Sequence, residues 1–380
     1  MRFVFFQNCI SPHQMPYIEA LSQRKEVDGV RVIAPRLTYG DRAAMGWSEE
    51  ETKDTPKLRV AISPSDADVK RWIREDTAAD HDKGEKTVCL FSGINAFPEV
   101  FHWLKMTFKS DVKRGDITEA PYLFDHPMWM HKMRFFFKDL RYVRKFSWVF
   151  AIGEGCKTYY EGWSSRWKVI PFMYCTQGIT PALQAEVDKN MPGNEREAKI
   201  CRIAFVGSVD ERKNVVCILE ALKQMGIDNA AALSRCKVTI VGDGPLKEKL
   251  QWKIHDDGIT GAIFFAGTKS MEETQQILAA QDILILPSLH DGWGAVVNEA
   301  LTLGVWPVIS NTCGARQIIE EGKNGNVFPV NDASALCALL EDAVKNIGRI
   351  RASRAARIEW ARTHISPEAV ADIMLRAVKS

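Results

Sequence analysis

The sequence predicts an α/β protein made of two doubly wound, Rossmann-like domains. Short apolar runs alternate with stretches of helical period along the whole chain, a pattern typical of α/β units. The apolar runs are continuous in Val, Ile and Phe, as expected for strands buried on both faces of a parallel sheet. The 380 residues, 46% of them hydrophobic, suffice for two domains with a core each.

The predicted strands follow one another in two sets. In the first half they lie at 2–6, 29–35, 87–93, 121–124 and 148–153, with a helical segment around 16–23. In the second half they lie at 201–207, 237–242, 262–267, 282–287 and 305–310, with a helix at 215–225. The polar segment 174–200 predicts a linker, and 347–380 is helical. We therefore expect domains at 1–175 and 176–362, and a terminal helix at 363–380 that packs back on the first domain.

Composition excludes several classes of protein. The 50 Lys and Arg against 48 Asp and Glu leave a net charge of +2, so no overall field attracts nucleic acid. No apolar run is long enough to span a membrane, and the first residues lack the pattern of a signal peptide. Nine scattered cysteines form no C-x-x-C pair. We expect neither a zinc site nor a disulfide framework, and a cytoplasmic protein.

The most informative segment is 287–307. A strand ends at Pro287, and the loop Asp291–Gly294 leads into a helix that holds Glu299. Glycines allow close backbone approach, and a helix N-terminus offers unpaired N–H groups that suit a phosphate. Asp291 and Glu299 are eight residues apart, and ionised carboxylates accept hydrogen bonds from sugar or ribose hydroxyls. The alternative interpretation makes Asp291 a helix cap and Glu299 a solvated helix residue.

Two further loops also follow predicted strands. In 207–214, Arg212 and Lys213 can supply positive charge to a diphosphate; the alternative is a solvated basic turn. The loop 242–245 reads Gly-Asp-Gly-Pro. It is not G-x-G-x-x-G, so a dinucleotide-binding fingerprint is not supported.

Together these motifs and their order resemble the retaining glycosyltransferases of family 4, which have the GT-B fold of two Rossmann-like domains facing a central cleft. The resemblance covers 201–340 well and the first half only loosely. Three positions depart from the family pattern. Asp291 replaces the first glutamate of the E-x7-E pair, Ser208 stands where an arginine is usual, and residues 7–14 replace a glycine-rich loop. The matching segments are 207–214, 242–245, 265–267, 287–300, 307–310 and 325–332.

The resemblance implies transfer of a sugar, with retention, from a UDP- or GDP-type nucleotide sugar to a glycan or lipid-linked acceptor, as in cell-surface polysaccharide synthesis. It implies no bound metal or other cofactor, an acceptor-binding first domain and a donor-binding second domain. Asp291 would bind the donor sugar, Glu299 the ribose, Lys213 the departing diphosphate and His126 the transferred sugar. The other expected nucleotide-binding residues are Gly207, Ser208, Arg212, Gly242, Asp243, Gly267, Thr268, Gly292, Trp293, Gly294, Ala295 and Val296.

The first half is less specific. His126 follows the predicted strand 121–124, and His13 lies in the loop after the first strand; either can be an ordinary loop histidine. The Asp66-Ala-Asp68 triplet looks like a metal-binding D-x-D, but its setting favours a capped helix start.

Segment 127–146 combines six Lys or Arg with one acid and six large aromatics. Such a helix can lie on an anionic membrane, here the inner face of the plasma membrane. The alternative is a domain helix with a buried aromatic face.

Two other functions stay open from the sequence. One is a non-catalytic GT-B module that binds a nucleotide or a partner, which the Ser208 and Asp291 departures favour. The other is a nucleotide-sugar epimerase on the same fold, which acts on free donors. Donor hydrolysis with and without an acceptor separates the three.

Overall fold

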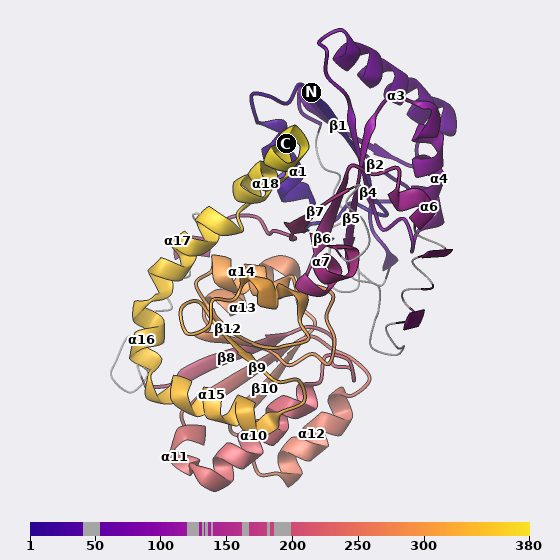
Figure 1. Cartoon of the computed structure of the whole chain (residues 1–380). Coiled ribbons are helices and arrows are strands. Elements are labelled where there is room, and N and C mark those ends of the chain that lie inside the picture. Colours follow the sequence, from indigo (N-terminus) through magenta and orange to yellow (C-terminus); the bar gives the residue numbers. More distant parts are fainter. Residues whose placement is uncertain are drawn as a thin grey trace. The chain divides into compact units, whose positions relative to one another are not determined.

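The computed structural model describes residues 1–40, 54–119, 129–130, 133, 136–137, 140–161, 167–180, 183–185 and 199–380. The chain folds into two units, which are treated separately below (Figure 1). The amino-terminal unit comprises 1–43, 48–175 and 367–380, and the carboxyl-terminal unit comprises 44–47 and 176–366.

The amino-terminal unit is built on a seven-stranded parallel sheet with the order β3-β2-β1-β4-β5-β6-β7. Its strands are β1 (Arg2–Phe6), β2 (Gly29–Ala34), β3 (Leu58–Ile62), β4 (Val88–Ser92), β5 (Lys113–Glu119), β6 (Trp148–Ile152) and β7 (Lys168–Phe172). The strand order reverses between β1 and β4. In such sheets ligands bind outside the carboxyl ends of the strands at the point of reversal.

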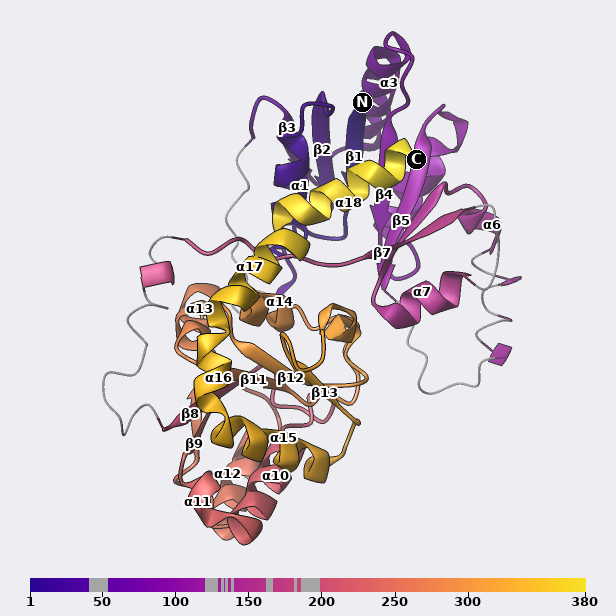
Figure 2. The ribbon, with the colours of Figure 1, turned by 60° about the vertical axis from the view of Figure 1, so that its left-hand side comes forward.

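Helices cover both faces of this sheet. They are α1 (Met15–Ser22), α3 (Asp66–His81), α4 (Pro98–Met106), α6 (Leu140–Val143), α7 (Glu154–Glu161) and α18 (Pro367–Lys379), with a 3-10 turn η1 (Thr107–Lys109). The Ser65 hydroxyl accepts a hydrogen bond from the Asp68 N–H at the start of α3. The Asp66-x-Asp68 triplet is therefore a capped helix start, as its sequence setting predicted. The carboxyl-terminal helix α18 packs against α1 (Figure 2).

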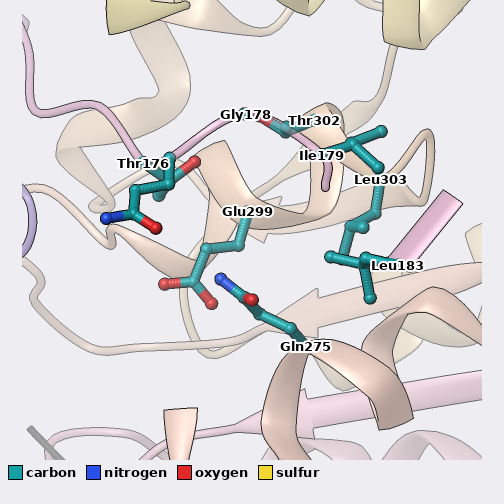
Figure 3. A pocket seen from close by; sticks show the side chains of 9 residues that line it. Thr176, Gly178, Ile179, Leu183, Gln275, Glu299, Thr302 and Leu303 are labelled. Carbon is teal, nitrogen blue, oxygen red and sulfur yellow. The ribbon is translucent and has the colours of Figure 1, made fainter. Parts of the chain in front are cut away.

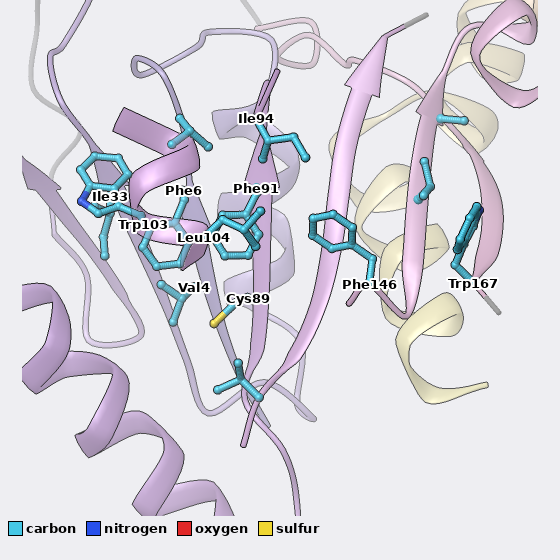
Figure 4. Packing of buried hydrophobic residues seen from close by; sticks show 14 of the residues in the cluster. Val4, Phe6, Ile33, Cys89, Phe91, Ile94, Trp103, Leu104, Phe146 and Trp167 are labelled. Carbon is cyan, nitrogen blue, oxygen red and sulfur yellow. The ribbon is translucent and has the colours of Figure 1, made fainter. Parts of the chain in front are cut away.

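The core of this unit confirms that its central strands are buried on both faces, because consecutive residues are buried in β1, from Phe3 to Phe6, and along all of β4. Val4 and Phe6 of β1 pack beside Cys89 and Phe91 of β4 (Figure 4). The Phe6 and Phe91 rings stack with centroids 4.8 Å apart, and Trp103 of α4 covers them. All these side chains are 5% exposed or less, so this part of the sheet forms a rigid platform for the loops at its carboxyl edge.

The carboxyl-terminal unit is built on a six-stranded parallel sheet with the order β10-β9-β8-β11-β12-β13. Its strands are β8 (Cys201–Val206), β9 (Cys236–Val241), β10 (Ile263–Gly267), β11 (Ile283–Leu286), β12 (Trp306–Ser310) and β13 (Asn326–Phe328). Its helices are α10 (Val215–Asp228), α11 (Ala230–Leu233), α12 (Lys247–Asp256), α13 (Met271–Ala279), α14 (Val296–Thr302), α15 (Ala333–Lys345), α16 (Ile347–Ala352) and α17 (Arg354–His364), with a 3-10 turn η3 (Gly314–Ile318).

Buried arginines fix the last helices of this unit on the sheet. Arg351 of α16 forms a two-pronged ion pair with Asp282, at 2.8 and 2.9 Å, just before β11. Arg357 of α17 is 2% exposed and donates two hydrogen bonds to the carbonyl of Gly304, directly after α14. Bidentate geometry is the strongest form of such pairs. These contacts therefore hold the helix that carries Glu299.

The predicted strands are confirmed wherever the structure describes them. The predicted strand 121–124 lies outside the described residues. Four strands were missed: β3, β5, β7 and the three-residue β13. All nine cysteines are buried, and none forms a disulfide, as predicted. In the described part of the chain, no helix is long and apolar enough to cross a membrane.

Candidate functional site

Glycines bring three loops together at the carboxyl edge of the second sheet. A Cβ atom at Gly242, whose φ is +132°, would lie 1.9 Å from the carbonyl oxygen of Gly207. A Cβ at Gly244 would lie 2.5 Å from the carbonyl oxygen of Val209. The Gly242 N–H in turn donates to the Gly267 carbonyl at 2.8 Å. The loops after β8, β9 and β10 therefore meet at distances that only glycine permits.

The loop 207–214 is organised by one carboxylate that the sequence analysis did not single out. Asp210 accepts a hydrogen bond from the Ser208 hydroxyl at 2.6 Å and another from the Lys213 N–H at 2.8 Å. Asn214 follows in the left-handed conformation, with φ 52°, and α10 begins after it. Because the Ser208 hydroxyl already donates to Asp210, Ser208 does not replace the missing arginine as a donor.

Lys213 and Asp291 form the charged centre of this edge. The Lys213 Nζ lies 2.6 Å from Oδ2 of Asp291, and the side chains are 13% and 12% exposed. Arg212 places Nη1 3.9 Å from the same oxygen and donates to the carbonyl of His290. Partial exclusion of water strengthens these charge interactions relative to a surface pair. Two cations around one carboxylate leave one positive charge, and Arg212 carries it toward solvent, since its side chain is 49% exposed.

The loop 291–294 is held rigidly behind that centre. Trp293 is buried and donates from its indole Nε1 to Oδ1 of Asn298 at 2.7 Å. Gly294 has φ +88°, and a Cβ there would lie 2.7 Å from the Cys313 sulfur. A Cβ at Gly314 would lie 2.0 Å from the Gly292 carbonyl. The Trp293 side chain is thus a structural anchor.

Glu299 lies in a separate small pocket of the same unit (Figure 3). Its side chain points toward Gln275 of α13, and Thr176 and Thr302 also line the pocket. Part of the Glu299 side chain remains open to solvent, yet burial raises the pKa of its carboxyl group from 4.5 to about 7. Asp291 does not line this pocket, so the structure does not bring the two predicted carboxylates into one pocket.

The remaining predicted residues of this unit lie in the loops just described. Asp243 is half-exposed and pairs with Lys247 at 2.5 Å, and a hydrogen bond from Lys247 lowers the pKa of the Asp243 carboxyl group. Thr268 follows Gly267 after β10. Ala295 and Val296 join the loop to α14. Asp243, Thr268, Ala295 and Val296 supply no further cation.

In the amino-terminal unit, His126 lies outside the described residues. His13 is described: its carbonyl accepts a hydrogen bond from the Cys175 N–H at 3.1 Å, and its ring lies 6.4 Å from that of Tyr174.

The basic aromatic segment, residues 127–146, divides into two parts. At its carboxyl end, Phe146 is 4% exposed in the core and Tyr142 packs edge-on against Phe101. At its amino end, Trp129, Phe136 and Phe137 are 61%, 62% and 65% exposed. The predicted cations Lys132, Arg134 and Lys138 lie outside the described residues.

Sequence reasoning missed Asp210, Gln275 and Asn298. The spacing of Asp210, three residues before Lys213, is that of a side chain that caps a turn, so Asp210 could have been found. Gln275 and Asn298 carry no local signal, since their partners come from other elements or from the far side of the loop.

Comparisons with known proteins agree with this arrangement. The family model "Glycosyl transferases group 1" matches residues 187–362. The lipopolysaccharide core biosynthesis glycosyltransferase LpsE of Rhizobium meliloti (strain 1021) is 26% identical over 220 residues, which cover 58% of this chain and 59% of LpsE. The amylovoran biosynthesis glycosyltransferase AmsK of Erwinia amylovora is 32% identical over 148 residues, 37% of this chain and 35% of AmsK. The chain thus matches less than two thirds of the length of these relatives.

At the level of the fold, the similarity to known structures extends over the full chain. The structure of Anabaena Alr3699/HepE in complex with UDP matches with a TM-score of 0.68 at 13% identity, and covers 100% of both chains. Two doubly wound units with a cationic, glycine-lined edge on the second define a GT-B protein. Within that class, residues 187–362 match the group 1 glycosyl transferases.

Proposed function

We propose that this protein transfers a hexosyl group, with retention, from a UDP- or GDP-type nucleotide sugar to a hydroxyl of a glycan or lipid-linked acceptor. The bond between the sugar and the β-phosphate oxygen breaks, the acceptor oxygen takes the sugar, the proton of the acceptor hydroxyl passes to the departing phosphate oxygen, and a nucleoside diphosphate leaves. The observation that carries the proposal is the cluster of Lys213, Arg212 and Asp291 at the glycine-lined edge, inside the region that the family model matches.

The cations act on the leaving group. Negative charge accumulates on the diphosphate as the sugar departs, and donors placed there in advance lower the barrier most. Lys213 is held in place from both ends: Asp210 fixes its backbone and Asp291 its Nζ. Arg212 adds the second charge in place of the arginine that Ser208 replaces. In this mechanism the two side chains and the N–H groups of 292–296 neutralise the diphosphate without a bound metal.

The carboxylates recognise hydroxyls. Asp291 would accept from the donor sugar while it orients Lys213, and Glu299 would accept from the ribose. The loops at Gly207–Ser208, Gly242–Asp243 and Gly267–Thr268 would flank the nucleotide. On this basis residues 176–362 form the donor-binding domain and residues 1–175 the acceptor-binding domain, with 363–380 attached to the latter.

The acceptor side includes His126 and His13 as candidate sugar contacts. A lipid-linked acceptor is supported by the exposed aromatics Trp129, Phe136 and Phe137 in a segment with six cations and one acid. Such a surface would hold the protein at an anionic membrane. The names of the relatives refer to the biosynthesis of lipopolysaccharide core and of amylovoran, which fits surface polysaccharide as the product.

Chromatography of UDP-glucose and GDP-mannose reactions tests the proposal. We expect slow release of UDP or GDP without an acceptor and faster release with a glycan or glycolipid acceptor. Lys213→Met should slow both about 100-fold, whereas Lys253→Met, on the same unit, should leave both unchanged. Tight binding of a nucleotide that is never cleaved would favour a non-catalytic module instead. Conversion of the donor into an isomeric nucleotide sugar would favour an epimerase.

A further inference from the structure

Three uncharged polar side chains meet at the switch point of the amino-terminal sheet. Gln7 directly follows β1, Ser92 is the last residue of β4, and Gln14 precedes α1. β1 and β4 are neighbours (Figure 2), and the strand order reverses between them. Gln7, Gln14 and Ser92 are 0%, 6% and 6% exposed. The doubly wound fold thus places buried polar groups where such sheets bind ligands.

Among the described residues, their hydrogen bonds leave the amide oxygen of Gln7 and the amide nitrogen of Gln14 without a partner. Gln7 donates from Nε2 to Oε1 of Gln14 at 2.7 Å, and the Ser92 hydroxyl lies 3.5 Å from the same oxygen. The oxygen of Gln14 is therefore occupied from the side of the sheet. Within the described residues, no hydrogen bond from Nε2 of Gln14 is found. Oε1 of Gln7 is buried and has no partner there.

An unused acceptor at this depth has a physical cost. A buried polar atom without a partner destabilises a protein by about 1–3 kcal/mol, and native structures contain few of them. Here the unpaired acceptor of Gln7 and the unused donor of Gln14 belong to two amides that share a hydrogen bond. A ligand hydroxyl, which both donates and accepts, can satisfy the two groups together.

The chemistry of the cluster selects the class of ligand. Gln7, Gln14 and Ser92 are neutral, so the cluster lacks the cation that a phosphate site needs. Glu119, the last residue of the neighbouring β5, accepts a hydrogen bond from the Tyr174 hydroxyl at 2.8 Å and extends the polar edge. Amides and hydroxyls in a row suit a neutral molecule with several hydroxyl groups.

We propose that this cluster, Gln7, Gln14 and Ser92, is a sugar-binding site in which the Gln14 amide contacts a hydroxyl of the ligand. Gln7 and Ser92 act as positioning residues that turn the Gln14 oxygen inward and its N–H groups outward. That this sugar is the acceptor rests on the proposed function. The site stands where residues 7–14 replace the glycine-rich loop of related sequences.

Saturation-transfer NMR of the full chain with glucose, galactose, mannose and N-acetylglucosamine tests the site. We expect at least one of these sugars to bind, and Gln14→Met to weaken its binding at least tenfold. Gln14→Glu should do the same, since a carboxylate still accepts from Gln7 but has no N–H to offer. Gln23→Met, an exposed glutamine just after α1, is the matched control and should bind like the wild type.

Calorimetry with UDP and GDP separates this inference from the proposed function. The Gln14 variants should bind either nucleotide as the wild type does. If the wild type binds a sugar through Gln14 but neither nucleotide, the proposed function fails and the site stands. If no sugar binds to the wild type, or if both Gln14 variants retain full binding, the inference is overturned, whatever the nucleotides do.

Discussion

Replacement of Glu299 by Gln should stabilise the protein while it weakens donor binding. Burial holds the pKa of the Glu299 carboxyl group at about 7, against 4.5 in water. Between pH 4.5 and about pH 7, the native state therefore binds more protons than the unfolded state. The free energy of unfolding therefore falls as the pH rises from about 4.5 to about 7, and the loss is complete above that range.

The size of the effect follows from the shift. At about 1.4 kcal/mol per pKa unit, a charged Glu299 costs the free protein up to about 3 kcal/mol at pH 8. Glu299→Gln removes this cost and should raise the free energy of unfolding by that amount at pH 8, but by less than about 1 kcal/mol at pH 5. The same substitution removes the carboxylate that we propose accepts from the ribose hydroxyls, and should weaken UDP or GDP binding by about 1.5–3 kcal/mol.

Urea unfolding at pH 5 and pH 8, with calorimetric titration of UDP and GDP, measures both effects. Glu220→Gln, at an exposed position of α10, controls for the loss of one negative charge. In the wild type, the affinity for the nucleotide should rise between pH 6 and pH 8, because ribose hydroxyls prefer the ionised carboxylate. A Glu299→Gln protein that is no more stable at pH 8 than at pH 5, relative to wild type, would refute the burial argument. Unchanged nucleotide affinity would remove Glu299 from the site.

Three other substitutions test separate parts of the structure. Gly242→Ala should lower the free energy of unfolding by more than about 3 kcal/mol, because its Cβ would lie 1.9 Å from a carbonyl oxygen. Gly258→Ala, with φ +70° in open space, is the control and should lower it by about 1–2 kcal/mol. Equal losses of the two variants in chemical denaturation would contradict the close approach at Gly242. Lys213→Ala should lower kcat about 100-fold, and a kcat within twofold of wild type would exclude it as the diphosphate contact. Phe137→Ser should weaken sedimentation with anionic liposomes at low salt, whereas Trp252→Ser, 72% exposed on the other unit, should not; equal effects would argue against a specific membrane surface.

Strands buried on both faces were predictable because their composition alone marks them. β11, for example, is apolar throughout, and β1 is apolar from Phe3 to Phe6. β5 reads Lys-Arg-Gly-Asp-Ile-Thr-Glu, which is polar, and forms because it completes the ladder between β4 and β6. β7 contains Pro171, which is tolerated because β7 is the edge strand. Strands such as β5 and β7 form because of their pairing with neighbouring strands, and the local sequence pattern carries no information on that pairing.

In the candidate site, too, some features follow from the local sequence and others depend on long-range packing. The position of each motif after a strand predicted that Lys213 and Asp291 reach one edge of the sheet. Their ion pair joins residues 78 positions apart, and it depends on β8 and β11 being neighbours. The raised pKa of Glu299 depends on its burial in a pocket that Thr176 and Gln275 help to line, and neither belongs to a motif. Local sequence therefore identifies the functional groups, while their electrostatics depend on long-range packing.

Calorimetric comparison of nucleoside diphosphates with monophosphates tests most directly whether the Lys213 cluster binds a diphosphate. If it does, UDP or GDP should bind at least tenfold more tightly than UMP or GMP, because the second phosphate meets Lys213 and Arg212. In Lys213→Ala this preference for the diphosphate should become severalfold smaller, because only Arg212 then remains to meet the second phosphate. Equal affinities of the wild type for diphosphate and monophosphate, or no binding of either diphosphate, would contradict the assignment of this edge as the donor site.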